Sequence, residues 1–502
     1  MKILTTAQTR AADAYTIQHE PISSIDLMER AAKQCSDWLM KKYDKGVLFS
    51  IFCGVGNNGG DGLVIARLLK QEGYDVSVLV VEFSKKYSDD FQVNLNRLKE
   101  VSIAPTYLTP NQYAFNLLEN SIVVDAIFGS GLSKPIGSFI AEIVTQINHA
   151  PNTVVAIDMP SGLFADSNIG NDKEDIIKAR YTLTFQQPKL TMLFPENYMY
   201  VGDFEVLDIG LHPQYLKETE SNKIYFTKTL AQAILHHRQK FSHKGSYGHA
   251  LLIAGSKGKM GAAVLSAKAC LRSGVGLLTT HIPKVGVEIM QTSVPEAMCI
   301  EDNENDYVSS LGAVEQFDVV GIGPGIGKER GTQNLLKLLI QNTKNPLVID
   351  ADALNILSEN KTWLAFLPQR SILTPHPKEF ERLVGKWSND KERLELQQEF
   401  SYVNKVYVVL KGANTSVSCP EGEVYFNSSG NAGMATGGSG DVLTGIITGL
   451  LAQGYSPKDA ALLGVYLHGV AGDIAKENLD ENAIIAGDLI HYLPMAFGWL
   501  KH

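Results

Sequence analysis

A glycine-rich run that ends in an aspartate is the clearest chemical feature of the chain. Residues 431–441 read NAGMATGGSGD, and after Asp441 apolar residues recur at the spacing of one helical face. The glycines therefore precede a helix N-terminus, where unpaired N–H groups and the helix dipole attract phosphate. Beside a bound polyphosphate, an aspartate can take a proton from a hydroxyl group as a general base. The alternative is that Asp441 only caps the helix.

Two other places in the C-terminal half carry polar side chains at the ends of predicted strands. Asp350 and Asp352 follow the apolar run PLVI, and they either hold magnesium through water, as phosphoryl transfer normally requires, or cap the next helix. His376 lies between two prolines after another apolar run, near a strand end where α/β sheets bind ligands. A lone histidine is usually structural, so position alone does not assign His376 a role.

A second glycine-rich turn lies near the N-terminus. Residues 54–62 read GVGNNGGDG, follow a predicted strand and open a predicted helix. They satisfy the GxGxxG pattern, and Glu82 ends the next strand, so a hydride-transfer dehydrogenase is one alternative. Asn57, Asn58 and Asp61 are polar additions that a dinucleotide turn does not require. They either bind an ion or a polar ligand group, or favour a tight turn.

Further polar residues follow later strands of the N-terminal half. Asp125 lies in VVDAIFGSGL, Asp158 in VVAIDMPSG and Lys189 in QQPKL. Because the carboxyl ends of parallel strands meet at one edge of a sheet, these side chains are expected to share one site.

The elements that position these residues alternate between strand and helix. A chain of 502 residues exceeds the roughly 250–300 that one hydrophobic core supports, so two domains are expected. After an opening helix at 25–43, strand-like and helix-length runs alternate to about residue 210 and again from residue 248, which predicts α/β domains with parallel sheets. The polar stretch 212–228 suits a linker. We therefore predict domains at 1–215 and 226–502, the first a Rossmann-like, doubly wound parallel sheet.

Composition limits the partners and the compartment. The formal net charge of -9, with no basic run, argues against nucleic acid as a partner. The five cysteines are scattered and never form CxxC, which favours a reducing compartment over a disulfide framework. We find neither a signal peptide nor a run near the roughly 18 apolar residues of a membrane span, so a cytoplasmic protein without membrane contact is expected.

Five C-terminal motifs together resemble a known family. GIGPGIG, VIDADALN, LTPHPKEF, KGANTSV and GNAGMATGGSGDVLTG closely resemble the ADP- or ATP-dependent NAD(P)H-hydrate dehydratases, which have a ribokinase-like fold. The resemblance implies that the nucleotide phosphorylates the C6 hydroxyl of the hydrated cofactor, with Asp441 as base and magnesium present, and that phosphate then leaves. It also implies nucleotide-binding residues, namely Lys411, Gly412, Ala413, Asn414, Thr415 and Gly440. The implied substrate-binding residues are Ala262, Gly325, His376 and Asp441.

The N-terminal motifs are similar to those of a second family. NNGGDG, DAIFGSGL, AIDMPSG and QQPKL look like the NAD(P)H-hydrate epimerases over about residues 1–215. The resemblance implies potassium ligands at Asn58, Asp125 and Ser161, and proton transfer by Asp158 and Lys189. The implied substrate-binding residues are Asn57, Asn58, Gly59, Gly60, Asp61, Gly129, Ser130, Gly131, Leu132, Ser133, Lys134, Pro135 and Asp158. The stretch 166–170 is longer than is usual in that family, which affects only local loop geometry.

The two resemblances together predict a bifunctional repair enzyme. The N-terminal domain would interconvert the R and S forms of the hydrates NADHX and NADPHX, and the C-terminal domain would dehydrate the S form with ADP or ATP. A homo-oligomer is also expected. Two alternatives remain at this stage: a ribokinase-like kinase that releases a stable phosphorylated product, and an N-terminal domain that binds ligands without catalysis.

Overall fold

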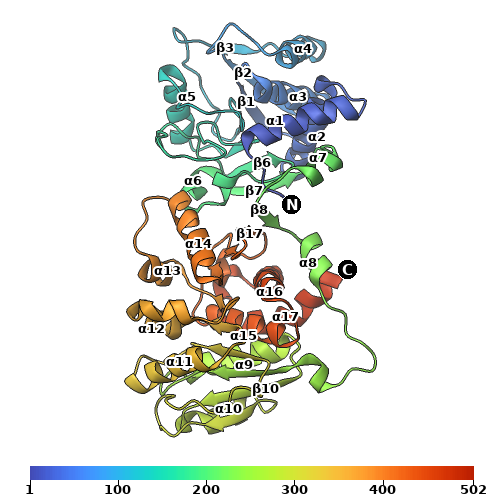
Figure 1. Cartoon of the computed structure of the whole chain (residues 1–502). Coiled ribbons are helices and arrows are strands. Elements are labelled where there is room, and N and C mark those ends of the chain that lie inside the picture. Colours follow the sequence, from blue (N-terminus) through green and yellow to red (C-terminus); the bar gives the residue numbers. More distant parts are fainter. Residues whose placement is uncertain (502) are drawn as a thin grey trace. The chain divides into compact units, whose positions relative to one another are not determined.

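The computed structural model describes residues 1–501 and divides into two compact units (Figure 1). One unit comprises Lys2–Ser221, and the other begins at Asn222 and also takes in Met1. Each unit has its own sheet, built mainly of parallel strands, and its own hydrophobic cores. The predicted α/β fold class is therefore confirmed.

In the described part of the N-terminal unit, seven strands form one parallel sheet in the order β3-β2-β1-β4-β5-β6-β7. The strands are β1 (Leu48–Cys53), β2 (Asp75–Val81), β3 (Thr106–Leu108), β4 (Ile122–Ala126), β5 (Val154–Ile157), β6 (Tyr181–Phe185) and β7 (Asp203–Leu207). The α-helices are α1 (Thr6–His19), α2 (Ser24–Lys42), α3 (Asn57–Gln71), α4 (Asp89–Arg97), α5 (Ser138–His149), α6 (Tyr198–Val201) and α7 (Pro213–Glu218). Short 3-10 helices are η1 (Leu98–Val101), η2 (Leu190–Leu193) and η3 (Pro195–Asn197).

This sheet is covered on both faces. Helices α2, α3 and α4 pack on one face around Phe49, Ile51 and Phe91, and α5 packs on the other around Phe52 and Ile143. Side chains of β1 alternate between the two cores, as the period of a strand requires. The strand order reverses between β1 and β4, so the crevice at their carboxyl ends is the expected place for a ligand.

In the described part of the C-terminal unit, ten strands form a mixed sheet in the order β11-β10-β9-β12-β13-β14-β15-β16-β17-β8. The strands are β8 (Lys223–Phe226), β9 (His249–Ile253), β10 (Leu277–Ile282), β11 (Met298–Glu301), β12 (Val319–Ile322), β13 (Leu347–Ile349), β14 (Ile372–Leu373), β15 (Tyr407–Leu410), β16 (Ser416–Ser418) and β17 (Val424–Asn427). Strand β16 runs antiparallel to both neighbours, and the other pairs are parallel.

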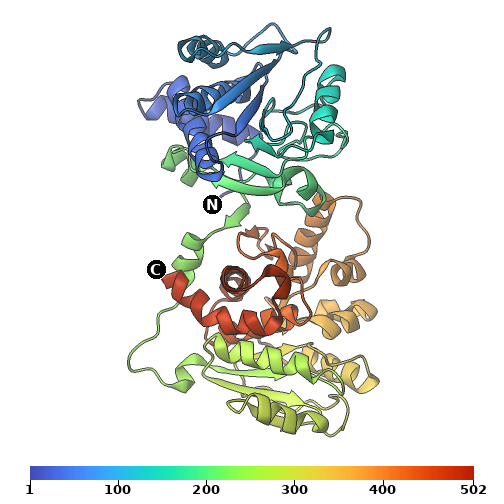
Figure 2. The ribbon, with the colours of Figure 1, turned by 180° about the vertical axis from the view of Figure 1, so that it is seen from behind.

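Helices cover both faces of this sheet as well. The α-helices are α8 (Lys228–Ile234), α9 (Met260–Arg272), α10 (Val287–Ser293), α11 (Arg330–Asn342), α12 (Ala351–Glu359), α13 (Pro377–Val384), α14 (Asp390–Asn404), α15 (Ser439–Ala452), α16 (Pro457–Asn478) and α17 (Ala486–Lys501). The 3-10 helices are η4 (Lys244–Tyr247), η5 (Lys284–Gly286), η6 (Lys361–Phe366), η7 (Ala432–Met434) and η8 (Glu481–Ala483). Helices α9, α15, α16 and α17 pack around one core, and α11, α12 and α13 around another. Figure 2 shows the red C-terminal helices beside the yellow-green α9.

Two local expectations differ from the structure. The first helix is α1 at Thr6–His19, which the sequence pattern did not indicate because its only buried residues are Ala12 and Thr16. The predicted linker at 212–228 is wrong, since it contains α7, β8 and the start of α8. Strand β8 pairs in parallel with β17 at the edge of the second sheet. A four-residue edge strand is too short to show a period of two in the sequence.

A search of residues 1–501 finds no helix with the length and apolar character that a membrane span requires.

Candidate functional site

The start of α3 presses against the end of β1. A methyl group on Gly59 would lie 1.7 Å from the carbonyl oxygen of Gly54, so only glycine permits this approach. The residues 57–61 consequently form the first turns of a helix at the carboxyl edge of the sheet. Asn58 is half-buried there, but both polar atoms of its amide are shielded from solvent and have no hydrogen-bond partner within the described chain. A buried amide without partners is costly, which indicates that a ligand or an ion completes this place.

Gly129 brings Asn58 and Asp158 together. A methyl group on Gly129 would lie 2.9 Å from Oδ2 of Asp158 and 3.2 Å from Oδ1 of Asn58. The next residue, Ser130, donates its backbone N–H to Oδ2 of Asp158 over 2.8 Å. The predicted loop 129–135 therefore begins against Asp158, while its last three residues, Ser133, Lys134 and Pro135, are exposed.

Asp158 forms a buried ion pair with Lys189. The Lys189 Nζ lies 2.5 Å from Oδ1 of Asp158 and also donates to Oγ1 of Thr184 over 2.8 Å. Burial alone would raise the pKa of Asp158, but Lys189 and the bond from Ser130 outweigh it and lower that pKa. Asp158 also has φ of 63°, a strained conformation for a residue with a side chain. The structure thus fixes an ionised carboxylate at the end of β5.

Asp125 and Ser161 meet at the neighbouring strand end. Ser161 donates its hydroxyl to Oδ1 of Asp125 over 2.6 Å and its N–H to Oδ2 over 2.7 Å, and Ile127 donates its N–H to Oδ1 over 3.2 Å. Burial raises the pKa of Asp125 to about 6, although these hydrogen bonds act to lower it. Both oxygens therefore already accept bonds from the protein.

Glu82, the residue that a dinucleotide-binding alternative would use for the ribose, is engaged within the protein. Its carboxylate accepts bonds from the Lys85 ammonium and the Tyr87 hydroxyl. These partners lower the pKa of Glu82 and leave its carboxylate already satisfied.

Two further carboxyl groups belong to this region. Burial and the charges of Asp158 and Asp13 raise the pKa of Asp61 well above its usual range. Burial, with the negative charge of Asp158, also raises the pKa of Asp13 to about 6, although Lys189 acts in the opposite direction. Sequence reasoning missed Asp13 because α1 was not expected. A signal was present, since Thr5 and Gln8 form the capping box that opens α1.

In the C-terminal unit the glycine loop leads directly into α15. Gly438 is the N-cap with φ of 90°, so Asp441 is the third residue of the helix and does not cap it. Its half-buried carboxylate has no hydrogen bond or ion pair to another residue in 1–501. Burial and the charge of Asp350 raise the pKa of Asp441 to about 6, although Lys411 opposes them. Asp441 is therefore an open carboxyl group at a helix N-terminus.

Lys411 faces the same loop from the end of β15. Its Nζ lies 2.9 Å from Oδ1 of Asp350 and 4.0 Å from Oε2 of Glu379. A methyl group on Gly440 would lie 3.3 Å from this Nζ. Thr444 donates its hydroxyl to Oδ2 of Asp350 over 2.7 Å. Residues at the ends of β13 and β15 and in α13 and α15 thus converge on one partly buried cation.

The remaining nucleotide-binding candidates form the turn between β15 and β16. Gly412 donates its N–H to the Thr415 hydroxyl over 3.2 Å, and this hydroxyl donates to the Gly412 carbonyl over 2.9 Å. Ala413 and Asn414 lie at the tip, with Ala413 exposed. The turn therefore follows Lys411 directly and borders the same edge of the sheet.

His376 caps α13. Its Nδ1 accepts the backbone N–H groups of Lys378 and Glu379 over 3.1 and 3.3 Å, so the ring proton of the neutral form lies on Nε2. Burial and the charge of Lys411 lower the pKa of His376. The ring therefore presents a neutral N–H donor, and its capping role was not foreseen from the sequence.

Ala262 and Gly325 are neighbours. A methyl group on Gly325 would lie 3.1 Å from the Cβ of Ala262, and Ser256 donates its hydroxyl to the Gly325 carbonyl over 2.7 Å. Asp352, in the first turn of α12, accepts the Gly327 N–H over 2.9 Å and lies 3.3 Å from the Lys259 Nζ. Asp350 occupies the N-cap of α12, but its side chain makes no capping bond.

The side chains that most often bind metal ions do not cluster in the part of the chain that the structure describes. Among residues 1–501, no group of three or more His, Cys, Asp or Glu side chains is arranged to hold a metal ion.

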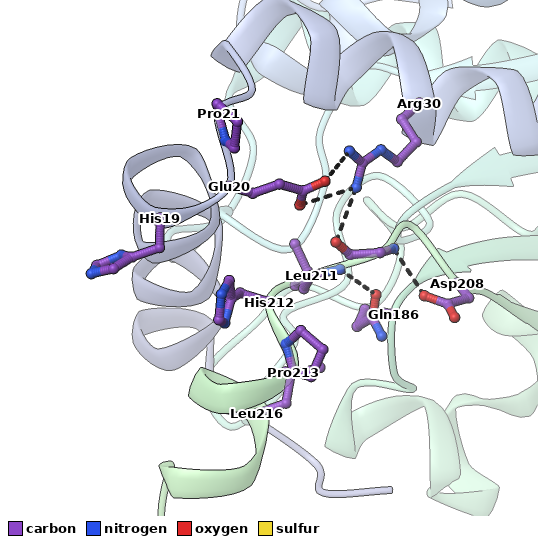
Figure 3. A pocket seen from close by; sticks show the side chains of 11 residues that line it. His19, Glu20, Pro21, Arg30, Gln186, Asp208, Leu211, His212, Pro213 and Leu216 are labelled. Atoms are coloured by element: carbon purple, nitrogen blue, oxygen red, sulfur yellow. Dashed lines mark hydrogen bonds and ion pairs between the residues drawn. The ribbon is translucent and has the colours of Figure 1, made fainter.

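A cavity of about 640 Å³ in the N-terminal unit lies apart from the predicted residues (Figure 3). It is lined by His19, Glu20, Pro21, Arg30, Gln186, Asp208, Gly210, Leu211, His212, Pro213 and Leu216. Figure 3 shows the Arg30 guanidinium bonded to Glu20, which lies 2.7 Å away, and Arg30 also donates to the Gly210 carbonyl over 3.0 Å. The Arg30 cation is thus already paired within the protein. None of the site residues predicted from the sequence lines this cavity.

Comparison with known proteins gives the family. A model described as NAD(P)H-hydrate dehydratase matches residues 250–495, and one described as YjeF-related protein N-terminus matches residues 24–191. The chain is 38% identical to a bifunctional NAD(P)H-hydrate repair enzyme of Moorella thermoacetica, over 98% of this chain and 96% of that protein. The chain belongs to the bifunctional NAD(P)H-hydrate repair enzymes. Relatives of the same name include those of Escherichia coli, 32% identical over 93% of this chain and 88% of that protein, and Leishmania major, 32% identical over 97% and 92%.

Solved structures resemble the C-terminal unit of this repair enzyme. A ribokinase-like superfamily protein of Enterococcus faecalis is 30% identical, with a TM-score of 0.50, and covers 57% of this chain and 99% of its own. An ADP/ATP-dependent NAD(P)H-hydrate dehydratase of Bacillus subtilis, co-crystallized with ATP and Mg²⁺, is also 30% identical, with a TM-score of 0.49, over 55% and 98%. The curated relatives confirm the predicted repair-enzyme family, and the Enterococcus faecalis structure confirms the ribokinase-like fold of the C-terminal unit. The roles of individual residues stay predictions.

Proposed function

We propose that the C-terminal unit dehydrates the S form of the hydrates NADHX and NADPHX with ADP or ATP, and that the N-terminal unit interconverts their R and S forms. The observation that carries the first part is the open Asp441 carboxyl at the N-terminus of α15, beside the partly buried Lys411 cation. The second part rests on the Asp158–Lys189 ion pair beside the unpartnered amide of Asn58.

In the dehydratase site the phosphates of the nucleotide rest on the glycine loop. The N–H groups at the start of α15 and the Lys411 ammonium stabilise their negative charge. Asp441 takes the proton of the C6 hydroxyl as this oxygen accepts the phosphoryl group. Phosphate then leaves C6 and a proton leaves C5, which re-forms the ring double bond. Phosphorylation matters because phosphate is a far better leaving group than hydroxide.

The other residues of the dehydratase site orient the two substrates. The turn of Gly412, Ala413, Asn414 and Thr415 borders the nucleotide, together with Gly440. Ala262 and Gly325 leave room for the hydrated ring, because neither carries a side chain beyond a methyl group. The neutral Nε2–H of His376 suits a carbonyl or hydroxyl of the substrate.

Magnesium fits this site as an ion that arrives with the nucleotide. Mg²⁺ is usually bound by one or two carboxylates, substrate phosphates and water, and Asp350 and Asp352 would hold it through water. Bound there, it would neutralise charge on the phosphates. The absence of a three-carboxylate cluster in the described chain agrees with such a shared site.

Potassium fits the epimerase site through Asn58. Its buried amide oxygen has no protein partner, and uncharged oxygens are ligands that K⁺ accepts. Asp125 and Ser161 would supply further oxygens, and the ion would organise the charged end of the substrate. The substrate itself would lie against residues 57–61, the loop 129–135 and Asp158.

Asp158 and Lys189 are proposed to assist proton transfer during epimerisation at C6. Reversible ring opening and reversible loss of water are both compatible with this pair. Asp158 stays ionised beside Lys189, so it suits stabilisation of a cation or acceptance of a proton.

Incubation with (S)-NADHX and ADP, and separately with ATP, tests the dehydratase assignment. The absorbance of the reduced nicotinamide should recover with at least one nucleotide. A kinase would instead accumulate a phosphorylated hydrate and leave the absorbance unchanged, and that result would overturn the proposal. The expected homo-oligomer stays a prediction that light scattering would check.

A further inference from the structure

Helix α1 lies on the loop that the epimerase reaction is proposed to use. Thr6 donates its hydroxyl to the carbonyl of Ser130 over 3.2 Å, and Arg10 donates to the carbonyl of Gly131 over 3.1 Å. On the other side of the site, Gln187 donates its amide to the hydroxyl of Thr9 over 3.2 Å. The family model that matches the N-terminal unit begins only at residue 24, so it does not include this helix.

These contacts define one face of α1. Counted from Thr6, the residues Thr9, Arg10 and Asp13 follow at three, four and seven positions, and this spacing places all four on the same side of a helix. Thr6 and Arg10 contact the first residues of the loop 129–135, and Thr9 contacts the residue two before Lys189. Asp13 is next along this face, so it points toward the Asp158–Lys189 pair.

The charges around Asp13 agree with this placement. Asp13 interacts electrostatically with Asp158 at the end of β5, with Lys189 after β6 and with Asp61 of α3. Because the Lys189 ammonium already forms an ion pair with Asp158 at 2.5 Å, it does not fully neutralise the negative charge of Asp13. Partial burial and the nearby Asp158 raise the pKa of Asp13 to about 6. No hydrogen bond or ion pair to the Asp13 carboxyl is found within residues 1–501.

We infer that Asp13 is a third acid–base group of the epimerase site, and that it moves the proton between the C6 oxygen and the ring nitrogen of the hydrate. This inference rests on the proposed function of the N-terminal unit. It adds a reacting group from α1, which precedes the residues 24–191 that the N-terminal family model matches.

The proton transfer balances with one carboxyl group. The Asp13 carboxylate takes the proton of the C6 hydroxyl, the freed electron pair forms the C6=O bond, and the C6–N1 electron pair goes to N1. Asp13 then gives the same proton to N1, which completes ring opening. After rotation about C5–C6, N1 attacks the other face of the carbonyl carbon, and Asp13 returns the proton from N1 to the oxygen. The Asp158–Lys189 pair assists these transfers by stabilising the charge that develops beside C6, and it ends each cycle in its starting protonation state.

The role assigned to Asp13 predicts a pH profile. The reaction starts with ionised Asp13, so kcat/KM for R-to-S conversion should rise with pH through about 6 and then level off. Dehydration of pure (S)-NADHX by the same polypeptide provides an internal control for folding and concentration, because it uses the other unit.

The test compares Asp13→Asn, Asp13→Glu and the control Asp37→Asn, which removes an exposed carboxyl on α2. Asp13→Asn should lower kcat for epimerisation by roughly a hundredfold or more, with KM little changed and the rise near pH 6 abolished. Asp13→Glu should restore part of the rate, and Asp37→Asn should match the unsubstituted enzyme.

Three outcomes would overturn the role of Asp13. One is an Asp13→Asn enzyme with unchanged kcat and pH profile, and another is a raised KM with unchanged kcat. If Asp13→Asn fails to fold, the test uses the unsubstituted enzyme. A kcat/KM for R-to-S conversion that does not change between pH 5 and 7 would then overturn the role of Asp13. Failure of the proposed function itself looks different, because the unsubstituted enzyme would then not interconvert the R and S forms at all.

Discussion

The Lys411 ammonium lies 2.9 Å from Oδ1 of Asp350, and the two residues approach each other from the ends of different strands. The Asp350 side chain is almost fully buried, with 2% of it exposed, and it also accepts the Thr444 hydroxyl. The pair therefore fixes the cation beside the glycine loop before any nucleotide binds.

The first prediction concerns this pair. Lys411→Met should lower the free energy of unfolding by about 3 kcal/mol, because it leaves a buried carboxylate without its cation. It should also raise the KM for ADP or ATP, because the phosphates lose a counter-charge. Denaturant unfolding and steady-state kinetics measure the two effects.

The matched control is the double variant Lys411→Met with Asp350→Asn. It should recover stability relative to Lys411→Met without recovering nucleotide affinity. Equal stability losses in the single and double variants would show that the buried charge is not what destabilises Lys411→Met.

The second prediction concerns the activity of Asp441. As a general base, Asp441 acts only when it is ionised, so dehydration should rise with pH through about 6. Asp441→Asn should lower kcat by roughly 10²–10⁴-fold and remove that rise. An unchanged kcat in the Asp441→Asn enzyme is the contradicting result.

The same substitution is predicted to stabilise the ligand-free enzyme. Folding raises the pKa of Asp441 from 3.8 to about 6, so the folded state holds the proton more tightly than the unfolded state. The stabilisation that the Asp441 proton gives the folded state is therefore fully present below pH 3.8, and it is lost as the pH rises through about 6. Above about pH 7, Asp441→Asn should be more stable by about 1–2 kcal/mol, with almost no difference below about pH 3. Thermal unfolding at several pH values measures this.

The third prediction concerns the cation of the epimerase site. Replacing potassium with tetramethylammonium should slow R-to-S conversion, because the larger ion cannot reach the buried Asn58 amide. Dehydration of the S form should keep its rate, which controls for general salt effects. Equal epimerisation rates in both salts would show that Asn58, Asp125 and Ser161 do not bind an ion that the reaction needs.

Much of the fold could be predicted because long buried strands alternate with amphipathic helices. Strands β1, β4 and β5 are almost entirely buried, and polar residues lie at or just after their carboxyl ends, namely Asn57 after β1, Asp125 in β4 and Asp158 after β5. Helix α1 was not predicted because only two of its residues, Ala12 and Thr16, are buried. Its other contacts with the N-terminal unit include hydrogen bonds from polar side chains, which leave no apolar periodicity in the sequence. Strand β8 escaped because its pairing partner, β17, lies about 200 residues away in sequence.

The candidate sites could be predicted where a motif holds several functional groups together, as around Asp441 and Asn58. What the sequence could not show is which polar groups already have protein partners. Asp350 is engaged by Lys411 and Thr444, whereas Asp441, in a similar position at a helix start, remains open. Such differences arise from side chains that are distant in sequence and adjacent in the fold.

The most direct test of the two proposed activities starts from an equal mixture of (R)- and (S)-NADHX with ADP or ATP. The unsubstituted enzyme should convert the whole mixture to NADH. Asp158→Ala should convert only the S half at the normal rate, and Asp441→Asn should form almost no NADH while it still interconverts R and S. The proposed division of labour is contradicted if Asp158→Ala consumes the R half as fast as the unsubstituted enzyme, or if neither nucleotide supports NADH formation.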